Sequence, residues 1–275
     1  MENLRECFDP AEWAALCAAS PDQPMAQSWD YGQAMAVLGA RVRRFVFGET
    51  IAQVLERPGL RLVNRGPLGP RAGPMLRRLA RHWGVTLATP EHALPGWGRM
   101  PLITPRHQAI WRLDPDADAM RGNLSAKWRN RLLRAEERGL RITHGQVASL
   151  NELLTAEAIQ RQQRGYRALP GAFAIHWPGE KLLLEWREGG QMQAGMLFLR
   201  HGAWASYHIG WASDRGRAVF AHGPMLWKAA RILSDQGIST LDLGTVDSAN
   251  PGLAHFKLGT GAELRALGPT VWAVW

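Results

Sequence analysis

Hydrophobic and polar positions alternate most clearly in the middle of the second half of the chain. Three apolar runs, LLLEW, GMLFLR and ASYHIGWA, lie between Lys181 and Ala212 and are separated by glycine-containing turns. This spacing predicts a β-meander. Helical spacing follows in Pro224–Gln236, with a proline in the first turn and a glycine after the end. Two late apolar runs, Leu241–Leu243 and Thr270–Trp275, predict further strands.

The remaining segments add helices and strands in a mixed order. Leu124–Arg138 has an amphipathic helical pattern that Asn123 or Ser125 can cap and Gly139 can end. Together with the meander, these segments predict an α/β fold in which helices flank a mixed sheet. The other predicted elements are helices at Gln27–Leu38, Met75–Trp83 and Leu150–Arg164, and strands at Val42–Phe47, Leu60–Asn64, Thr86–Ala88, Ile110–Leu113 and Leu140–Thr143.

The charge balance narrows the classes of partner. The chain has 275 residues, of which 46% are hydrophobic, and its 33 basic residues exceed its 24 acidic residues, for a formal net charge of +9. A chain of this length buries a sizeable core in one large or two small domains. The positive excess favours nucleic acid, phosphate-bearing cofactors or an acidic membrane surface as partners, although an arginine-rich protein without such a partner has the same composition.

Cysteine usage and the N-terminal sequence favour a reducing compartment. The two cysteines, Cys7 and Cys17, do not form a CxxC pair, which argues against a disulfide framework or a zinc site. The first residues, MENLRECFDPAEW, lack the basic start and apolar run of a signal peptide. No apolar stretch approaches membrane-spanning length. We therefore expect a cytoplasmic protein without a metal site or a transmembrane segment.

The segment LDLGTVDSANPGLAHFKLGTG, from Leu241 to Gly261, carries the first candidate chemistry. An apolar strand ends at Gly244, and a polar loop then leads to Phe256 and Lys257 before the final glycines. Glycines permit tight turns and close backbone approach to a ligand. A lysine fixed among such turns is suited to bind a phosphate or an oxyanion, although a surface lysine in a strand–loop–strand connection shows the same local pattern.

Positive side chains follow one face of the helix predicted at Leu124–Arg138. They are spaced by four, three and four residues, so they share a face beside an apolar stripe. Arginines without interleaved acids raise the local affinity for phosphates, although a solvated charged face has the same pattern. The residues of this basic face are Lys127, Arg131, Arg134 and Arg138.

Two other segments concentrate groups that bind anions. The run QRQQRGYRALP places Arg164, Tyr166 and Arg167 after the predicted helix Leu150–Arg164, where positive charge also favours a helix C-terminus. The loop Ala212–Pro224 precedes a predicted helix, whose N-terminal N–H groups can form an anion site. The candidates in this loop are Arg215, Arg217, His222 and Gly223.

His208 and Asp247 are the main candidates for proton transfer, and His222 is a further one. His208, in the predicted strand SYHIGW, has a side chain whose ordinary pKa suits a general base, but a structural histidine inside the sheet fits the same position. Asp247 can act as an alternative base or orient an amine, or it can hold its own loop by hydrogen bonds. His222 is open to the same two interpretations, with helix capping as its structural role.

The order of these motifs resembles the FemAB-like branch of the GNAT acyltransferase superfamily, which includes the peptidoglycan-bridge aminoacyltransferases and the BioF2-like acetyltransferases. The run Ala229–Leu264 resembles the family's helix, "fDlgG" strand and "gl..FK.gfG" loop, with Thr245 and Thr260 as departures. LSAKWRNRLLRAEERGLRI resembles its basic helix, LRLVNRGPLGP its "yvpRGPv" strand end, and QSWDYGQAMAVLG its first helix. The resemblance therefore covers nearly the full chain in family order.

The resemblance implies two tandem GNAT-like units, a degenerate one at 1–112 and a catalytic one at 113–275. It implies transfer of an acyl group from an activated donor to an amine, with Lys257 stabilising negative charge. It also implies that Arg65 lies between the two units, for substrate contact or structural pairing, and that the basic segments hold the phosphates of donor or acceptor. The implied substrate-binding residues are Arg65, Lys127, Arg131, Arg134, Arg164, Tyr166, Arg167 and Phe256.

Three functions remain open from the sequence. Acetyl-CoA-dependent GNATs carry a Q/R-x-x-G-x-G/A loop, and the loop here, from Arg217 to Gly223, departs from that spacing. An N-acyltransferase using acyl-CoA, a transferase using aminoacyl-tRNA, and a non-catalytic nucleic-acid-binding module on the same fold are therefore all compatible with the chain. In the first two, the donor is a co-substrate and no cofactor is tightly bound.

Overall fold

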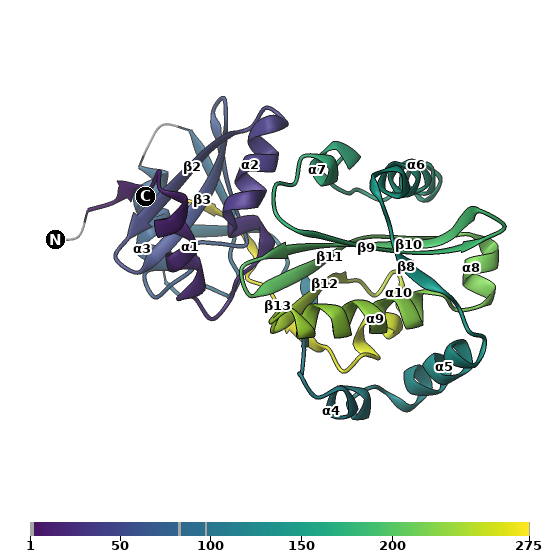
Figure 1. Ribbon diagram of the computed structural model, residues 1–275. Helices are drawn as coiled ribbons and strands as arrows, with labels where there is room; N and C mark the ends of the chain where they lie inside the picture. The colour runs from purple at the N-terminus through teal and green to yellow at the C-terminus, as the bar shows by residue number, and fades with distance from the viewer. Residues whose placement is uncertain (1–2, 82–83, 97, 275) are drawn as a thin grey trace. The chain divides into compact units, whose positions relative to one another are not determined.

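The computed structural model describes residues 3–81, 84–96 and 98–274, and it divides into two compact units (Figure 1). Each unit has its own sheet and its own hydrophobic core. None of the helices in these ranges combines the length and apolar character needed to cross a bilayer. Unit 1 comprises Met1–Gln108, Ala172–Pro178 and Arg265–Trp275, and unit 2 comprises Ala109–Gly171 and Gly179–Leu264.

A seven-stranded mixed sheet forms the centre of unit 1 in its described residues. Neighbouring strands are antiparallel except β4 and β5, which are parallel. Its strands, in spatial order, are β1 (Arg5–Glu6), β2 (Arg41–Phe47), β3 (Thr50–Arg57), β4 (Leu60–Asn64), β5 (Val85–Thr89), β14 (Thr270–Ala273) and β6 (Arg99–Ile103). Its helices are α1 (Pro10–Ala18), the 3₁₀ turn η1 (Met25–Gln27), α2 (Trp29–Val37), α3 (Ala72–Ala80) and α7 (Gly171–Ile175).

Local sequence explains the helices that were predicted in unit 1. Ser28 caps α2 by accepting a hydrogen bond from the Tyr31 N–H at 3.1 Å, as the pattern Gln27–Leu38 predicts. In α3, Met75, Leu76 and Leu79 are buried against the sheet, which anchors the helix. The predicted helix Met75–Trp83 overlaps α3 from Met75 to Ala80. Its last two residues lie outside the described ranges.

The C-terminal strand joins the sheet of unit 1, which differs from the expected division into 1–112 and 113–275. β14 pairs antiparallel with β5 and with β6, so that Val271 lies opposite Ala88 on one side and Pro101 on the other. An extended segment satisfies its main-chain N–H and C=O groups by pairing, and here both partners come from the first hundred residues. Of the predicted strand Thr270–Trp275, Trp275 lies outside the described ranges.

Unit 2 contains a second seven-stranded mixed sheet among its described residues, and the predicted meander forms its centre. In spatial order the strands are β13 (Glu263–Ala266), β7 (His107–Arg112), β12 (Thr240–Val246), β11 (Trp204–Ala212), β10 (Gln191–His201), β9 (Lys181–Glu188) and β8 (Ile142–His144). The helices are α4 (Ala117–Gly122), α5 (Ala126–Glu137), α6 (Val147–Arg164), α8 (Asp214–Ala218), α9 (His222–Asp235) and α10 (Pro251–Leu258).

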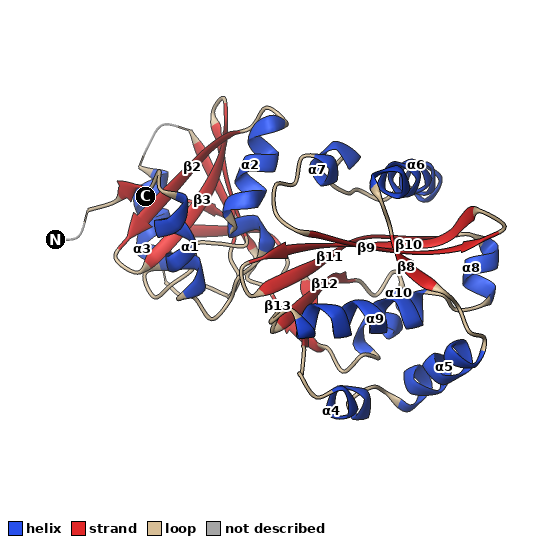
Figure 2. Cartoon of the chain, in the orientation of Figure 1, coloured by secondary structure: helices blue, strands red, loops and turns tan. Residues whose placement is uncertain are grey.

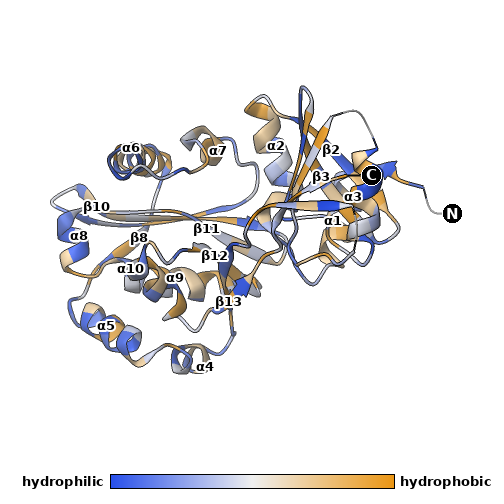
Figure 3. Cartoon of the chain, turned by 180° about the vertical axis from the view of Figure 1, so that it is seen from behind, coloured by the Kyte–Doolittle hydropathy of each residue, from blue (hydrophilic) through white to orange (hydrophobic). Residues whose placement is uncertain are grey.

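Helices cover both faces of the second sheet (Figure 2). α6 packs on one face, and α5, α9 and α10 lie on the other. Leu132 of α5 and Leu226 of α9 share a core cluster with Met196 of β10 and Leu241 of β12. Hydrophilic positions remain along α5 and α8, on the side away from this core (Figure 3). The expected α/β fold, with helices flanking mixed sheets in two units, is confirmed.

Candidate active site

The strands β11 and β12 separate part of the way along their length. They run parallel, and in the described chain their pairing covers Trp204↔Thr240, Ala205↔Leu241 and Ser206↔Asp242, although β11 continues to Ala212 and β12 to Val246. The register of β11 against β10 shifts between Ile209 and Tyr207, so His208 is an extra residue in a β-bulge. Unpaired strand edges expose main-chain N–H and C=O groups, so this opening between β11 and β12 can receive a ligand.

Lys257 is fixed beside this opening. It lies in the last turn of α10, and its Nζ donates a hydrogen bond to the Thr245 carbonyl, near the end of β12, at 2.8 Å. The residue is only 5% exposed. A Cβ atom on Gly244 would lie 3.5 Å from the same Nζ, which shows how closely the lysine follows the strand end. The lysine is therefore held inside the protein instead of extending into solvent.

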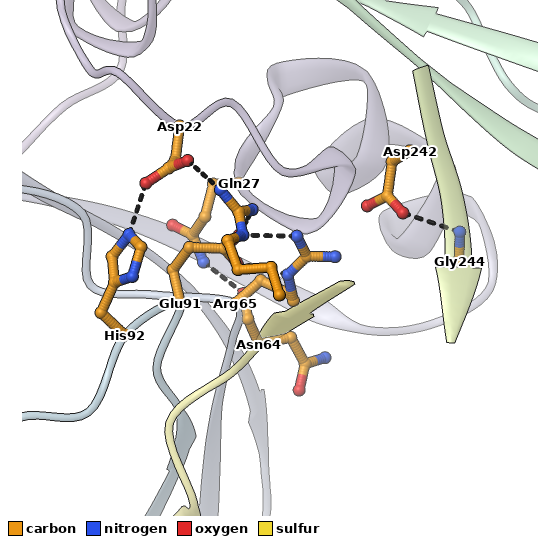
Figure 4. Close-up of polar contacts among 9 residues, drawn as sticks. Asp22, Gln27, Asn64, Arg65, Glu91, His92, Asp242 and Gly244 are labelled. Carbon is orange, nitrogen blue, oxygen red and sulfur yellow. Dashed lines mark hydrogen bonds and ion pairs between the residues drawn. The ribbon is translucent and has the colours of Figure 1, made fainter. Parts of the chain in front are cut away.

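Asp242 supplies the negative charge near this lysine. Its Oδ1 accepts a hydrogen bond from the Gly244 N–H at 2.7 Å, and the residue is buried (Figure 4). Burial lowers the pKa of Lys257, the carboxylate of Asp242 partly offsets that effect, and the resulting pKa is about 8. The ammonium form therefore predominates at neutral pH. Sequence reasoning missed Asp242, although a carboxylate inside an apolar strand, LDLG, was the available signal.

The two faces of the sheet carry different side chains beside the opening. Leu241 and Leu243 of β12 belong to the core cluster beneath α9 and α10. Because side chains alternate along a strand, Asp242 and its partner Ser206 face the side on which α6 packs. Ser206 shares a hydrogen bond of 2.8 Å with Nε2 of His201, which sequence reasoning also missed.

The two predicted proton acceptors differ in their surroundings. His208 lies in the bulge of β11, and burial lowers its pKa to about 4, so its imidazole is neutral at pH 7. Asp247 is exposed in the loop after β12, and its Oδ1 accepts a hydrogen bond from the Ala249 N–H at 2.9 Å. That local bond is the loop-stabilising role expected of an aspartate in this position.

A cavity of about 560 Å³ lies on the α9 and α10 side of the sheet, between α5, α10 and the segment from α8 to the start of α9. Its wall is mostly apolar and aromatic. The Trp128 and Phe256 rings stack with centroids 6.3 Å apart, and the Trp128 Nε1–H donates to the Phe256 carbonyl at 3.0 Å. The next residue after Phe256 is Lys257. α10 therefore presents an aromatic ring to the cavity and an ammonium group to the end of β12.

His222 forms another part of the cavity wall. Its Nε2 donates to the Trp211 carbonyl at 3.0 Å, which fixes the tautomer and leaves Nδ1 as the acceptor. Burial lowers the pKa of His222, so the ring is neutral at pH 7. Its ring centroid is 6.3 Å from that of Phe256. His222 is therefore a neutral wall of the cavity, with a hydrogen bond that ties α9 to β11.

Cations surround the cavity, and they include several of the predicted binding residues. The cations that line it are Lys127, Arg131 and Arg217, and the predicted residue Gly223 also belongs to the lining. Arg217 donates to the Ala212 carbonyl and, through Nη2, to Asp214 at 2.7 Å. Arg134 is exposed on α5 one turn beyond Arg131, outside the lining.

Other predicted residues are not brought to the cavity. Arg215 forms two hydrogen bonds of 2.8 Å with Glu188 and lies outside the lining. Arg164, Tyr166 and Arg167 lie at the C-terminal end of α6, on the opposite face of the sheet, where Tyr166 Oη donates to Glu157 at 3.0 Å. The helix-end interpretation of this cluster therefore fits its position.

Arg65 belongs to unit 1 and takes part in a buried ionic network (Figure 4). Its Nη2 donates to Glu91 Oε1 at 2.7 Å, and its Nε also donates to this carboxylate. Arg265 donates to both Glu91 and Asp22, and His92 lies 2.6 Å from Asp22. The structural role expected for Arg65 was a pairing between the two units, whereas its pairing with Glu91 lies within unit 1. Its expected substrate contact stays a prediction.

The loop before α9 uses several of its main-chain donors internally, which leaves fewer N–H groups for the anion site expected here. The N–H groups of Arg217, Val219, Phe220, Ala221 and Gly223 donate to carbonyls of the same segment, and the Gly216 N–H donates to Ser213 Oγ at 3.0 Å. An N–H group engaged in this way does not bind a phosphate.

The comparisons with known proteins show the fold. No protein-family model matches the chain, and no curated protein sequence matches it. Among solved structures, FemX superposes with a TM-score of 0.82 at 14% identity, covering 99% of this chain and 97% of FemX. A tandem GNAT protein from the clavulanic acid biosynthesis pathway gives 0.55 at 12% identity over 99% and 98% of the two chains.

A further similar structure is L-PGS from Bacillus licheniformis, with a TM-score of 0.60 and 12% identity over 97% of this chain and 92% of that chain. At these identities the likeness establishes the fold and leaves the chemistry to the residues. The chain therefore has the tandem GNAT-like fold of FemX and its structural neighbours, as the sequence resemblance predicts.

Proposed function

We propose that this protein is an N-acyltransferase that moves an acyl group from an activated, phosphate-bearing donor such as an acyl-CoA to an amine. The observation that carries the proposal is the position of Lys257, a buried ammonium held 2.8 Å from the Thr245 carbonyl where β11 and β12 separate. A cation with few competing water molecules stabilises developing negative charge far better than one in solvent.

The donor occupies the aromatic cavity beside α10. Its acyl end points toward the opening between β11 and β12, and its phosphates meet the rim formed by Lys127, Arg131 and Arg217. The acceptor amine approaches the opening from the face that carries Asp242 and Ser206. Holding the two reactants on either side of one opening removes much of the entropic cost of bringing them together.

The reaction forms one bond and breaks one. The amine nitrogen attacks the carbonyl carbon, so a C–N bond forms and a negative tetrahedral oxygen develops beside Lys257. The C–S bond of a thioester, or the C–O bond of an ester, then breaks, and the leaving group takes up a proton equivalent to the one that the amine loses. His208 is neutral and able to accept that proton, but with a pKa of about 4 it is a weak base, so positioning and charge stabilisation supply most of the rate.

A second candidate donor is an aminoacyl-tRNA, whose ester carbonyl offers the same chemistry. Two observations favour it. The N–H groups of Arg217, Val219, Phe220, Ala221 and Gly223 are bonded within their own segment, which leaves few main-chain donors there for a pyrophosphate. The exposed basic face of α5 continues past the cavity through Arg134, which suits an extended chain of phosphates.

The test is a product screen with purified protein, a panel of acyl-CoAs or a pool of charged tRNAs, and a metabolite extract as the source of amines. Mass spectrometry detects the acylated or aminoacylated product. We expect a product from one donor class, and a loss of roughly 100-fold or more in rate for Lys257→Met. Lys181→Met, at an exposed lysine of the same unit, is the matched control and keeps the rate.

Two results would contradict the proposal. Absence of any product from both donor classes, together with salt-dependent binding of tRNA, would indicate a non-catalytic nucleic-acid-binding module on this fold. A Lys257→Met variant that is folded and fully active would show that the buried ammonium has no part in the reaction.

A further inference from the structure

Phe220 combines three features that a residue in a simple connecting loop does not need. Its backbone lies in the left-handed region, with φ of 56°. A bulky side chain rarely adopts this conformation, which is costly unless surrounding structure holds it. The residue is 45% exposed, and it lies at the wall of the aromatic cavity. A strained backbone therefore presents a large apolar ring to solvent at the cavity.

Two guanidinium groups contact this ring. The Arg131 Cζ lies 5.3 Å and the Arg138 Cζ 5.9 Å from the Phe220 ring centroid. Arg131 lies in α5 and Arg138 is its C-cap residue, seven positions later, so they belong to one side of the helix and approach the ring together. Cation–π contacts of this kind orient the guanidiniums, while the large exposed fraction of the ring stays available for another planar group.

The N–H groups of Phe220 and Ala221 are already engaged within the chain. The Phe220 N–H donates to the Arg217 carbonyl at 3.0 Å, and the Ala221 N–H donates to the Gly216 carbonyl at 3.0 Å. A phosphate-bearing ligand at this end of the cavity therefore meets two side chains of its lining, the ring of Phe220 and the guanidinium of Arg131. Arg138 lies outside that lining but contacts the same ring. An aromatic face with flanking arginines is the chemistry that recognises a nucleobase together with its phosphates.

We propose that Phe220 is the stacking residue for the base of a nucleotide-bearing donor, and that Arg131 and Arg138 bind the phosphates of that nucleotide. The inference deepens the proposed function and rests on it for the location of the donor. The shared ligand chemistry is a phosphorylated adenosine, which both a coenzyme A thioester and the 3′ end of a charged RNA carry. Phe220 thus sets the specificity for the adenosine of the donor.

The experiment measures binding of two probes that carry no acyl group, by calorimetry or fluorescence at fixed salt. One probe is adenosine 3′,5′-bisphosphate, and the other is a short single-stranded RNA ending in CCA. We expect one of them to bind the wild-type protein, and Phe220→Ala to weaken that binding roughly tenfold or more, in line with the loss of one base–aromatic stack. Phe220→Trp keeps a ring and retains the affinity. Phe8→Ala, at another highly exposed phenylalanine that lies in unit 1, leaves it unchanged.

Phe220→Gly separates binding from folding. Glycine adopts the left-handed conformation without strain, so this variant loses the ring but is expected to keep or raise the melting temperature. Weakened probe binding with an undiminished melting temperature supports the stacking role. Probe binding by Phe220→Gly equal to that of the wild type overturns it, as does failure of both probes to bind the wild-type protein.

The result is independent of the test of the proposed function. Because neither probe can react, a failed product screen does not alter the binding measurement. Equally, a protein that forms product at the wild-type rate and KM after Phe220→Ala substitution would retain the proposed function and lose the proposed stacking residue.

Discussion

Lys257 and Thr245 join the end of α10 to the end of β12 through a hydrogen bond of 2.8 Å from Nζ to the main-chain carbonyl. The twelve-residue separation between them contains the exposed loop with Asp247 and the short helix that presents Phe256 to the cavity. A main-chain carbonyl is a partner that side-chain substitution cannot remove. The ammonium group is thus placed by the fold itself, close to the opening between β11 and β12.

The rate of acyl transfer is expected to fall as pH rises through about 8. Burial lowers the pKa of Lys257 from its ordinary 10.5 to about 8, so above that pH the lysine loses the charge that stabilises the oxyanion. The measurement is kcat/KM between pH 6 and pH 10 with the donor identified in the product screen. The same profile for Lys257→Met corrects for deprotonation of the acceptor amine, which affects both proteins. A ratio of wild-type to variant rates that does not fall through pH 8 would contradict the role proposed here.

Lys257→Met is expected to stabilise the protein at pH 7, with a difference that shrinks at alkaline pH. A pKa lowered from 10.5 to about 8 corresponds to a cost of about 3 kcal/mol for keeping the charged lysine buried. Between pH 8 and 10.5 the unfolded wild-type chain keeps a proton that the folded chain has lost, so the wild-type free energy of unfolding rises with pH. Denaturant unfolding of both proteins at pH 7 and pH 10 measures the difference.

The matched control is Lys127→Met, which removes the same charge at an exposed position of α5. Its effect on the free energy of unfolding should be small at both pH values. Equal stability differences at pH 7 and pH 10 for Lys257→Met would show that Lys257 is not held in a low-pKa environment.

Asp242→Asn is expected to move the alkaline limb of the rate profile to lower pH. The amide keeps an acceptor for the Gly244 N–H but removes the negative charge that raises the pKa of Lys257. The variant should therefore lose activity at pH 8 more than at pH 6.5, while its melting temperature changes little. An unchanged limb would mean that Asp242 does not interact electrostatically with the lysine.

Arg265→Ala is expected to destabilise unit 1 by about 3–5 kcal/mol, because it leaves the carboxylates of Asp22 and Glu91 buried with fewer compensating charges. Arg5→Ala removes an exposed arginine from a surface ion pair with Glu12 and is the matched control, with little effect expected. Urea unfolding of both variants tests this difference. Similar stabilities would show that the network contributes no more than a surface pair.

The same network predicts sensitivity to acid. Burial tends to raise the pKa of Asp22, but His92 and Arg265 outweigh that effect and the net shift is downward. A lowered carboxyl pKa contributes stability that is present above the unfolded value of about 3.9 and is lost as pH falls through the folded value. Acid titration of the wild type and of Arg265→Ala should therefore converge at low pH.

Several parts of the fold and site could be predicted from local pattern. The meander of β9, β10 and β11 followed from three apolar runs with glycine turns, and α5 from its amphipathic spacing and the cap at Ser125. The choice of Lys257 as a candidate followed from its position between a strand end and glycines, and the structure shows that this lysine is buried. These features depend on residues near in sequence, where side-chain periodicity and turn chemistry act directly.

Other parts depend on contacts between distant segments. Whether Arg131 or Arg134 reaches the cavity depends on where α5 lies relative to α10 and the loop before α9, because both arginines occupy the same predicted face. Arg164, Tyr166 and Arg167 matched a binding pattern, and only the position of α6 decides that they lie on the face of the sheet opposite the cavity, which is the acceptor side in the proposed function. The strained backbone of Phe220 had no sequence signal, since a phenylalanine does not favour a positive φ.

The sequence by itself determined the alternation of strands and helices, the mixed sheets and the presence of a lysine suited to an oxyanion, because periodicity and glycine placement act within a few residues. The tertiary structure alone decided that β14 completes the sheet of unit 1, that Asp242 and Thr245 surround Lys257, and that the loop before α9 uses its own N–H groups. Hydrogen bonding and burial between segments far apart in the chain set these features, and no local pattern specifies which distant partner a strand or a side chain will meet.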